Sequence, residues 1–578
     1  MSRQTYRVCF CFRRRFRLAA ADAPADIKNI FKEYSEGGMM SVDQLRRFMV
    51  EVQGERNATV ESAQGIVDGL KHLHIFHRRG LSLEAFFRYL IGDGNPPLDP
   101  KPEIHHDMTA PLSNYFIFTS HNTYLTGNQI SSDSSDIPIV RALRGGVRVI
   151  ELDLWPNSAK DDVDVLHGRT LTTPVELIKC LKSIKEHAFI ASEYPVVLTF
   201  EDHLTADLRA LVAQMITQTF GEMLYTTDLD LQRQFPCPES LKRRILVSTK
   251  LPKRSGSQIV KEMESRKGRV SNKDKAQRTE ETSYNKDDST DGMDIEIDED
   301  IEKDPKLQQH IIPEYMNLIS IPAGKVKGGI RDWLRVDPSK VRRLSLSEQE
   351  FERATNDYGE DIIRFTQRNL LRVYPKAARL DSSNYNPMIA WMHGAQMVAL
   401  NLQGYGKSLR LMHGMFTANG GCGYVKKPDF LLNTGPNIFN PRAHLPVKTT
   451  LRVNVYMGEG WYYEFPHTHF DSYSPPDFYA KIAIVGVPAD TMKRKTKIID
   501  DTFIPTWDDL FVFPLTVPEL ALLRIEVRES DASGQTNFAG QTCLPVSELR
   551  QGIRAVPLYG RKGERYRYVR LLMRFEFV

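Results

Sequence analysis

The sequence predicts a multidomain α/β protein, on three observations. Residues 24–92 show helical periodicity, the stretch from 103 to 440 alternates short apolar strands with helices, and the pattern from Thr449 onward is all-β. At 578 residues the chain exceeds what one hydrophobic core usually supports. We therefore expect a helical lobe, a TIM-type (β/α)8 barrel split by a disordered linker, and a C-terminal antiparallel β-sandwich.

Composition points to an ordinary soluble protein. Hydrophobic residues make up 41% of the chain and charged residues 26%, and the formal net charge is only +4. A charge this small over such a length does not favour a nucleic-acid partner, although local basic patches can still meet an anionic membrane. The six cysteines are scattered and no apolar stretch approaches the roughly 20 residues of a spanning helix, so we expect reduced thiols in the cytoplasm.

Residues 1–22 form a basic N-terminal segment in which arginines surround Cys9 and Cys11. The apolar island is too short and interrupted for a secretory signal. One interpretation is an unstructured or helical lead-in. The other is that the arginines and cysteines assist membrane binding, by electrostatics or by acylation.

Residues 23–92 are predicted to form two pairs of amphipathic helices. The first pair has two apolar faces at helical spacing: Ile27, Ile30, Phe31 and Tyr34, then Leu45, Phe48, Met49 and Val52. The loop between them, EYSEGGMMSVDQL, lacks the alternating Asp or Asn ligands and the terminal Glu of a calcium-binding loop. We therefore favour a structural lobe over a calcium sensor.

Polar side chains end four apolar strands of the predicted barrel. The strand at 115–118 leads to His121 and Asn122, the strand at 147–155 carries Glu151 and Asp153 on one side, and 164–168 and 195–202 lead to His167 and Glu201. The carboxyl ends of parallel barrel strands meet at one mouth, where active sites lie. A strand-end carboxylate is commonly a solvated loop residue, but two acids within an apolar strand favour function because buried charge is costly.

The residue types at these strand ends suit phosphodiester cleavage. One carboxamide oxygen and three carboxylates form an all-oxygen set for a hard cation such as calcium or magnesium. Two histidines can serve as general acid and as donor to an anionic phosphorus centre.

The second half of the barrel follows a segment in which basic and acidic residues are clustered in separate blocks. Nine Lys or Arg lie in residues 250–275, and twelve Asp or Glu in 280–304. Residues 251–308 are therefore predicted to form a disordered linker. This linker is either a solvated tether or an acidic lid that anionic lipid repels. Beyond it, LRVYPK, MVALNLQ and GYVKKP are predicted strands, and NGGCGY is a tight turn rather than a nucleotide loop.

The motifs TSHNTYLTGNQ, ELDLW, LHGRTLTTP and YPVVLTFEDH closely resemble the X half of phosphoinositide-specific phospholipase C, and RLSLSE, RVYPKAARLDSSNYNP and NGGCGYVKKP resemble its Y half. The resemblance covers nearly the whole chain and is to the plant type. It implies an EF-hand-like lobe at 23–92, the X half at 103–250, the Y half at 309–440 and a C2 sandwich at 449–578.

The resemblance implies calcium-dependent hydrolysis of phosphatidylinositol 4,5-bisphosphate or a related phosphoinositide to diacylglycerol and inositol trisphosphate, through a cyclic phosphodiester. His121, His167 and Glu151 would be catalytic, with Glu201 an alternative base. Ca²⁺ would be held by Asn122, Glu151, Asp153 and Glu201. The substrate would be bound by Lys250, Ser345, Arg372 and Tyr374.

The sandwich loops carry acids that, by the same resemblance, would bind further calcium: Asp471, Asp477, Asp501, Glu529 and Asp531. The implied partner is an anionic phospholipid membrane, and we expect a monomer in the cytoplasm that binds the plasma membrane peripherally. Two alternatives stay open: a catalytically inactive phosphoinositide- or calcium-binding scaffold of the same architecture, and a barrel phosphodiesterase of the glycerophosphodiester type, which would need neither the Y half nor the sandwich.

Overall fold

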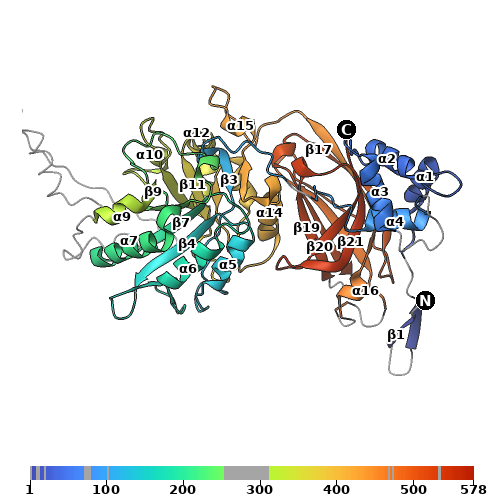
Figure 1. The fold of residues 1–578 in the computed structure, drawn as a ribbon, viewed down its shortest axis with the longest axis horizontal. Coiled ribbons are helices and arrows are strands. Elements are labelled where there is room, and N and C mark those ends of the chain that lie inside the picture. The colour runs from blue at the N-terminus through green and yellow to red at the C-terminus, as the bar shows by residue number, and fades with distance from the viewer. Residues whose placement is uncertain are drawn as a thin grey trace, which may run out of the picture.

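The computed structural model describes residues 3–7, 13–17, 21–70, 80–100, 103–252, 312–466, 469–470, 474–530 and 536–578. Its parts lie in a row (Figure 1): the barrel at one end, the β-sandwich in the middle, and the helical lobe on the far side of the sandwich. The expected fold class is confirmed. The predicted linker falls largely on residues 253–311, which lie outside the described part of the chain.

Eight parallel strands form the barrel, four from each half of the chain. Each pairs with its neighbour in the order β3-β12-β11-β10-β9-β8-β7-β4, and a parallel bridge between Thr119 and Val149 closes the ring. The strands are β3 (Tyr115–Ile117), β4 (Val149–Pro156), β7 (Val196–Asp202), β8 (Ile245–Lys250), β9 (Ile319–Ala323), β10 (Arg343–Ser347), β11 (Leu370–Tyr374) and β12 (Met397–Val398). A ring of parallel strands needs crossover connections, and these are helical.

The helices between these strands cover the outside of the barrel and pack on its strands in one hydrophobic core. Their apolar faces follow the helical period that the sequence shows. They are α5 (Ile137–Arg144), α6 (Leu177–His187), α7 (Ala206–Phe220), α9 (Pro313–Leu318), α10 (Ile330–Trp333), α11 (Glu348–Asp357), α12 (Gly359–Thr366), α13 (Pro387–Met392) and α14 (Lys407–Met415), with α15 (Asp429–Leu432) after the last strand.

Two predicted barrel strands are not barrel strands. The strand that precedes His167 is β5 (Val163–Val165), which pairs antiparallel with the end of β4 and then with β6 (Val175–Glu176). Only six residues separate β4 from β5, too few for a parallel crossover, so the chain turns back as a hairpin. GYVKKP supplies β13 (Tyr424–Lys426), which pairs antiparallel with β3. ILVSTK supplies β8 and is therefore the fourth barrel strand along the chain.

The helical lobe consists of α1 (Ala25–Tyr34), α2 (Val42–Glu51), α3 (Val60–Gly69) and α4 (Leu83–Ile91). Ser41 and Thr59 cap α2 and α3 by accepting hydrogen bonds from backbone N–H groups, which fixes where these helices begin. The predicted apolar faces meet in the core of the lobe, and the same core continues into the sandwich at four residues: Tyr456, Met457, Ile553 and Leu572.

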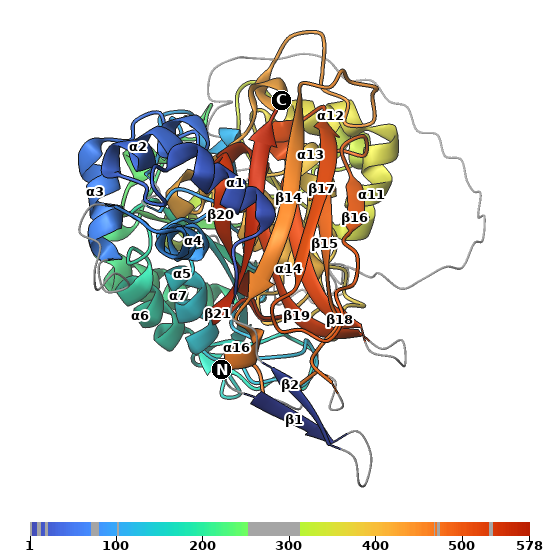
Figure 2. The ribbon, with the colours of Figure 1, turned by 90° about the vertical axis from the view of Figure 1, so that its right-hand side faces the viewer.

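Polar contacts lock the lobe to the sandwich. The Gln53 side chain pairs with both backbone groups of Ile553, accepting from its N–H at 2.5 Å and donating to its carbonyl at 2.8 Å. The buried Arg554 donates to Glu55 at 2.8 Å. Figure 2 shows the lobe lying along one side of the sandwich strands. These contacts hold the lobe against the sandwich.

The sandwich contains an eight-stranded antiparallel sheet in the order β16-β15-β18-β19-β20-β21-β14-β17. Alternate side chains along its strands form a second, separate core. Its elements are β14 (Thr449–Glu459), β15 (Phe478–Val485), β16 (Met492–Lys495), β17 (Thr506–Leu515), β18 (Leu522–Ser530), β19 (Thr536–Pro545), β20 (Gly552–Tyr559) and β21 (Arg565–Phe577), with α16 (Trp461–Glu464) after β14.

Helix α14 of the barrel joins the two domains, because it packs against β19 and β18 of the sandwich. Gly414 makes the close approach possible: a Cβ at this position would stand 2.6 Å from the Cys543 sulfur. The barrel and the sandwich therefore share a direct, tightly packed interface.

The basic N-terminal segment forms two short antiparallel strands, β1 (Arg3–Arg7) and β2 (Arg13–Arg17). The expected unstructured or helical lead-in is therefore wrong for these residues, because they pair as β-strands. Cys9 and Cys11 lie outside the described residues. In the described part of the chain, none of the helices is both long and apolar enough to cross a membrane.

Candidate active site

Carboxylates from two neighbouring strands converge at the mouth of the barrel. Asp153 of β4 lies beside Glu201 of β7 in register, and Glu151 is two residues earlier on the same side of β4. One ligand oxygen from each lies within 4.8 Å of the others. Glu151 and Asp153 are buried, whereas Glu201 is exposed at the rim. The three predicted carboxylates therefore lie close together.

One carboxylate of this acidic cluster, that of Asp153, lacks a full set of hydrogen-bond donors in the described structure. Tyr124 donates its hydroxyl to Asp153 Oδ2 at 2.5 Å, but the other oxygen, Oδ1, is buried and has no hydrogen-bond partner among the described residues. Burial, together with Glu201 and Glu151, raises the pKa of Asp153 well above its usual value. An unpartnered buried oxygen amid like charges fits a hard divalent cation.

The other two carboxylates have partners. The Glu201 side chain reaches solvent, but the protein groups packed around it partly desolvate it and oppose its ionisation. The hydrogen bond from His203 at 2.8 Å and the charges of His203 and Arg372 together hold the pKa of Glu201 below its usual value. Glu151 Oε2 lies 2.5 Å from Arg372 Nη2 and accepts from the backbone N–H of Asn122 at 3.2 Å. Arg372, predicted to bind substrate, thus lies within the carboxylate cluster.

Both histidines are anchored through Nδ1 in a way that fixes their tautomers. The His167 Nδ1–H donates to the Gln129 carbonyl at 2.6 Å. The His121 Nδ1–H donates to Asn401 Oδ1 at 2.9 Å, an oxygen that also accepts from Gln129. In each ring Nε2 is the nitrogen that remains to face a reactant. Burial lowers the pKa of His121, so this ring is neutral before an anion arrives.

Gln129 is the residue that connects these groups, and sequence reasoning did not select it as a functional residue. Its carbonyl holds His167, its Oε1 accepts from Asn122 at 3.0 Å, and its Nε2 donates to Asn401 and Ser382. The residue is buried. It is a positioning residue: it fixes one side chain of the acidic site and both imidazoles at once. Its position at the end of the motif TSHNTYLTGNQ is the sequence feature that could have identified it.

We expect Gln129→Leu to lower kcat about 10–100-fold while KM changes little, because the substitution removes three side-chain hydrogen bonds but no group that contacts substrate. Gln129→Glu, which keeps the acceptor oxygen but replaces the amide donor with a second oxygen, should fall between wild type and Leu. Steady-state kinetics on both variants, with circular dichroism to confirm folding, measures this. Equal activity of all three proteins would contradict the positioning role.

The residues predicted to bind substrate lie on adjacent barrel strands. Ser345 of β10 pairs in register with Arg372 of β11, and Ser347 with Tyr374. The Tyr374 ring lies nearly parallel to the His121 ring, with centroids 6.5 Å apart, and Arg372 lies 5.2 Å from the Tyr374 ring. Lys250 ends β8, farther round the barrel. These residues lie on the barrel wall from β8 to β11, and Arg372 also contacts Glu151 of β4.

Exposed apolar side chains flank the mouth. Leu171 is 79% exposed, and its backbone N–H donates to the Ile130 carbonyl at 2.7 Å. Leu380, 50% exposed, accepts through its carbonyl from the N–H of Gln129. Ile130, Leu171 and Leu380 together form an exposed apolar rim.

Three of the five acids predicted to bind calcium in the sandwich lie together. The Asp477 carboxylate accepts from the Asp501 N–H at 2.7 Å, and Phe478 pairs in register with Glu529. Glu529 is buried and accepts from Asn537 at 2.8 Å. Asp477 and Asp501 lie outside the strands, whereas Glu529 lies in β18 and not in a loop as expected. Asp471 and Asp531 lie outside the described residues.

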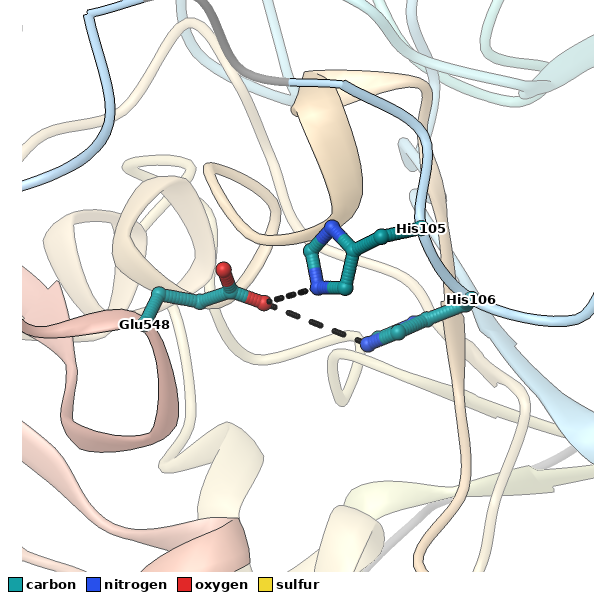
Figure 3. A group of neighbouring side chains, drawn as sticks. All are labelled: His105, His106 and Glu548. Atoms are coloured by element: carbon teal, nitrogen blue, oxygen red, sulfur yellow. Dashed lines mark hydrogen bonds and ion pairs between the residues drawn. The ribbon is translucent and has the colours of Figure 1, made fainter. Parts of the chain in front are cut away.

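A second cluster with metal-ligand chemistry joins the start of the barrel to the sandwich (Figure 3) and has a simpler explanation. His105 Nε2 and His106 Nε2 lie 3.1 Å and 3.9 Å from Glu548 Oε1. His106 Nδ1 accepts from the Lys426 N–H, so the proton of the neutral ring is on Nε2, and burial lowers its pKa to about 4. A protonated Nε2 donates a hydrogen bond and does not ligate a metal. The cluster is an interdomain hydrogen-bonded contact.

Comparisons with known proteins agree with this architecture. The chain matches the phosphatidylinositol-specific phospholipase C X domain over residues 108–251, the Y domain over 335–430, a C2 domain over 449–559, and the EF-hand-like domain of phosphoinositide-specific phospholipase C over 22–96. It is 59% identical to phosphoinositide phospholipase C 2 of Arabidopsis thaliana, across 100% of both chains.

More distant relatives share the same organisation. The chain is 33% identical to mouse 1-phosphatidylinositol 4,5-bisphosphate phosphodiesterase delta-3, over 93% of this chain and 66% of that one. The crystal structure of S. officinalis PLC21 superposes with a TM-score of 0.74 at 25% identity, covering 96% of this chain and 68% of that one. The full-length match to the plant relative, the X and Y domains and the shared fold lead to one conclusion: this chain is a plant-type member of the phosphoinositide phospholipase C family, a class of phosphodiesterases.

Proposed function

We propose that the protein hydrolyses phosphatidylinositol 4,5-bisphosphate and related phosphoinositides to diacylglycerol and inositol trisphosphate in a calcium-dependent reaction. The observation that carries this proposal is the convergence of two tautomer-fixed imidazoles and three carboxylates at one barrel mouth. The inositol 2-hydroxyl attacks the phosphodiester in line and forms a cyclic phosphate, which water then opens. An intramolecular nucleophile gains from proximity.

Four oxygen-bearing side chains would hold Ca²⁺: Asn122, Glu151, Asp153 and Glu201. The orphaned Asp153 oxygen and the crowding of carboxylates support this set. When bound, Ca²⁺ lowers the pKa of the 2-hydroxyl and neutralises charge on the phosphoryl oxygens. Glu151 accepts the hydroxyl proton; Glu201, partnered by His203, is the second candidate base.

The two histidines act through Nε2. Burial keeps His121 neutral, but an anionic phosphate favours the imidazolium, whose Nδ1–H stays on Asn401 while Nε2–H donates to a phosphoryl oxygen. His167, held by the Gln129 carbonyl, protonates the departing glycerol oxygen and then acts as base toward water in the second step.

The ring phosphates are recognised by Lys250, Ser345 and Arg372, with Tyr374 against the inositol ring. Because Arg372 also neutralises Glu151, we propose that it shifts from Glu151 to a ring phosphate as cation and substrate enter. Ser248, where many animal relatives have lysine, is buried and donates to the Ile321 carbonyl. One fewer cation weakens the preference for the bisphosphate over the monophosphate.

The acids of the sandwich loops, Asp471, Asp477, Asp501, Glu529 and Asp531, would bind Ca²⁺ together with anionic lipid head groups. The juxtaposition of Asp477, Asp501 and Glu529 supports this. The apolar rim at Ile130, Leu171 and Leu380 then enters the lipid. We propose a monomer in the cytoplasm that binds the plasma membrane peripherally.

The test is turnover of phosphatidylinositol, its 4-phosphate and its 4,5-bisphosphate in mixed micelles over a calcium titration. We expect calcium-dependent release of soluble inositol phosphate from all three, with the bisphosphate preferred by about tenfold or less, since one desolvated cation contact is worth about 1.4 kcal/mol. Calcium-dependent binding of all three without turnover would instead favour the inactive scaffold.

A further inference from the structure

A second arginine, Arg343, lies inside the barrel beneath the residues predicted to bind substrate. It begins β10, and its side chain points to the same face of that strand as the side chain of Ser345. Its register partner on β11, Leu370, belongs to a core that takes residues from most of the barrel strands and therefore fills the interior. Ser345 in turn pairs with Arg372. Arg343 is thus one row deeper in the barrel than Ser345 and Arg372.

The Arg343 guanidinium is buried without a counter-ion. The residue is only 6% exposed, and its Nε is enclosed with no hydrogen-bond partner among the described residues. Within the described part of the chain, no carboxylate lies at ion-pair distance from its nitrogens. Burial and the charge of Arg372 lower the pKa of Arg343 to about 9, against the opposing effect of Glu151, so the side chain stays charged at neutral pH. An unpaired buried cation is unfavourable, which supports an anion that enters from outside the chain.

The carboxylate that acts electrostatically on Arg343 already has other partners. Glu151 Oε2 lies 2.5 Å from Arg372 Nη2 and accepts from the Asn122 N–H. Arg372 Nε, like that of Arg343, is buried without a hydrogen-bond partner in the described structure. Two neighbouring guanidiniums therefore depend on one carboxylate, which the proposed Ca²⁺ would also bind. This side of the barrel interior has a surplus of positive charge.

A third cation lies in the same row of the barrel wall. Lys250 of β8 and Arg343 of β10 pair in register with the same residue of β9, Ala323. Residues on next-nearest strands are roughly 10 Å apart, a span that a lysine and an arginine side chain can bridge over a small alanine. A phosphate group suits this arrangement, because its oxygens accept from a planar guanidinium and from an ammonium at once.

We propose that Arg343 is a specificity-determining residue, which binds a ring phosphate of the inositol head group from the floor of the site together with Lys250. The proposal rests on the proposed function and deepens it, since it adds a cation beneath Ser345 and Arg372. Phosphatidylinositol has no ring phosphate and gains nothing from this cation, whereas its 4-phosphate and 4,5-bisphosphate do. The preference for the bisphosphate then depends largely on Arg343.

The test is Arg343→Met, which removes the guanidinium and keeps a long side chain in its place. We expect the ratio of kcat/KM for the 4,5-bisphosphate to kcat/KM for phosphatidylinositol to fall about tenfold, since one charged hydrogen bond in an enclosed site is worth this much. Arg343→Lys, which keeps the charge but loses the planar fork, should have an intermediate ratio. Kinetics in mixed micelles at saturating calcium measure the ratio. The melting temperature of Arg343→Met should equal or exceed that of wild type, because an unpaired buried charge is gone.

The matched control is Arg353→Met, which removes the same charge from an exposed position of α11 and should keep the wild-type ratio. A selective loss on the bisphosphate alone would assign Arg343 to the 5-phosphate, and a loss on both phosphorylated lipids would assign it to the 4-phosphate. An unchanged ratio in Arg343→Met would overturn the proposal. Equal losses on all three lipids, with a lowered melting temperature, would reduce Arg343 to a structural residue and also overturn it.

Calorimetric binding of soluble inositol 1,4,5-trisphosphate separates this proposal from the proposed function, because it needs no turnover. We expect the Kd to rise about tenfold in Arg343→Met and to stay at the wild-type value in Arg353→Met. Equal affinity of wild type and Arg343→Met would overturn the role of Arg343. Wild-type protein that turned over none of the three lipids would count against the proposed function alone, and the comparison of Kd values would still decide this proposal.

Discussion

His121→Ala is expected to lower turnover of phosphatidylinositol 4,5-bisphosphate by about 10³-fold or more. The variant loses the Nε2–H donor at the position where charge develops on phosphorus, and such donors in enclosed sites are worth this much. Vesicle binding should persist, because His121 lies within the barrel, distant from the sandwich loops. Release of soluble inositol phosphate and vesicle sedimentation measure the two properties.

The control for this substitution is His444→Ala, which changes an exposed histidine in the segment between barrel and sandwich. It should leave both readouts unchanged. Thermal melting separates loss of the donor from loss of the fold, since Asn401 and Gln129 keep each other hydrogen-bonded without the imidazole. Turnover retained within tenfold of wild type, or lost vesicle binding with turnover retained, would refute the role given to His121.

Chelation of calcium is expected to reduce turnover at least 10³-fold and to weaken docking through the sandwich loops at the same time. The physical reason differs for the two sites. In the barrel, three clustered carboxylates would repel an anionic phosphate once their cation is gone; in the sandwich, the acids would repel anionic lipid directly.

Single substitutions can separate these two effects. Asp153→Asn should abolish turnover and keep calcium-dependent docking, whereas Asp501→Asn should weaken docking and keep turnover of a soluble short-chain substrate. Turnover that continues unchanged in EGTA would remove calcium from the mechanism and favour a phosphodiesterase of another type. Restoration by calcium but not by magnesium would fit the larger, more flexible coordination of Ca²⁺.

Much of the site could be predicted because its residues follow apolar strands. The acids at 151 and 153 stand on one side of β4 for a purely local reason, the two-residue period of a strand. Strand direction is not local. A three-residue stretch such as Val163–Val165, in which two valines flank Asp164, fits either a barrel strand or a hairpin, and only its pairing with β4 decides.

The contacts that sequence reasoning missed depend on barrel closure. Gln129 meets Asn401 across 272 residues of sequence, and Arg372 reaches Glu151 from the opposite half of the chain. Neither contact leaves a periodic signal, because each joins the ends of strands brought together only when the eight-stranded ring is complete. Sequence patterns identify side chains whose chemistry suits the reaction, but they do not identify the long-range contacts that position those side chains.

The docking of the helical lobe has a consequence for biosynthesis. Gln53 finds its backbone partner at Ile553, 500 residues later. At roughly 5–20 residues per second, a ribosome needs on the order of a minute to make the intervening chain. Throughout that time the nascent lobe would lack the residues that complete its apolar interior, Tyr456, Met457, Ile553 and Leu572. The lobe thus emerges long before its packing can be finished, and chaperones have a long opportunity to act there.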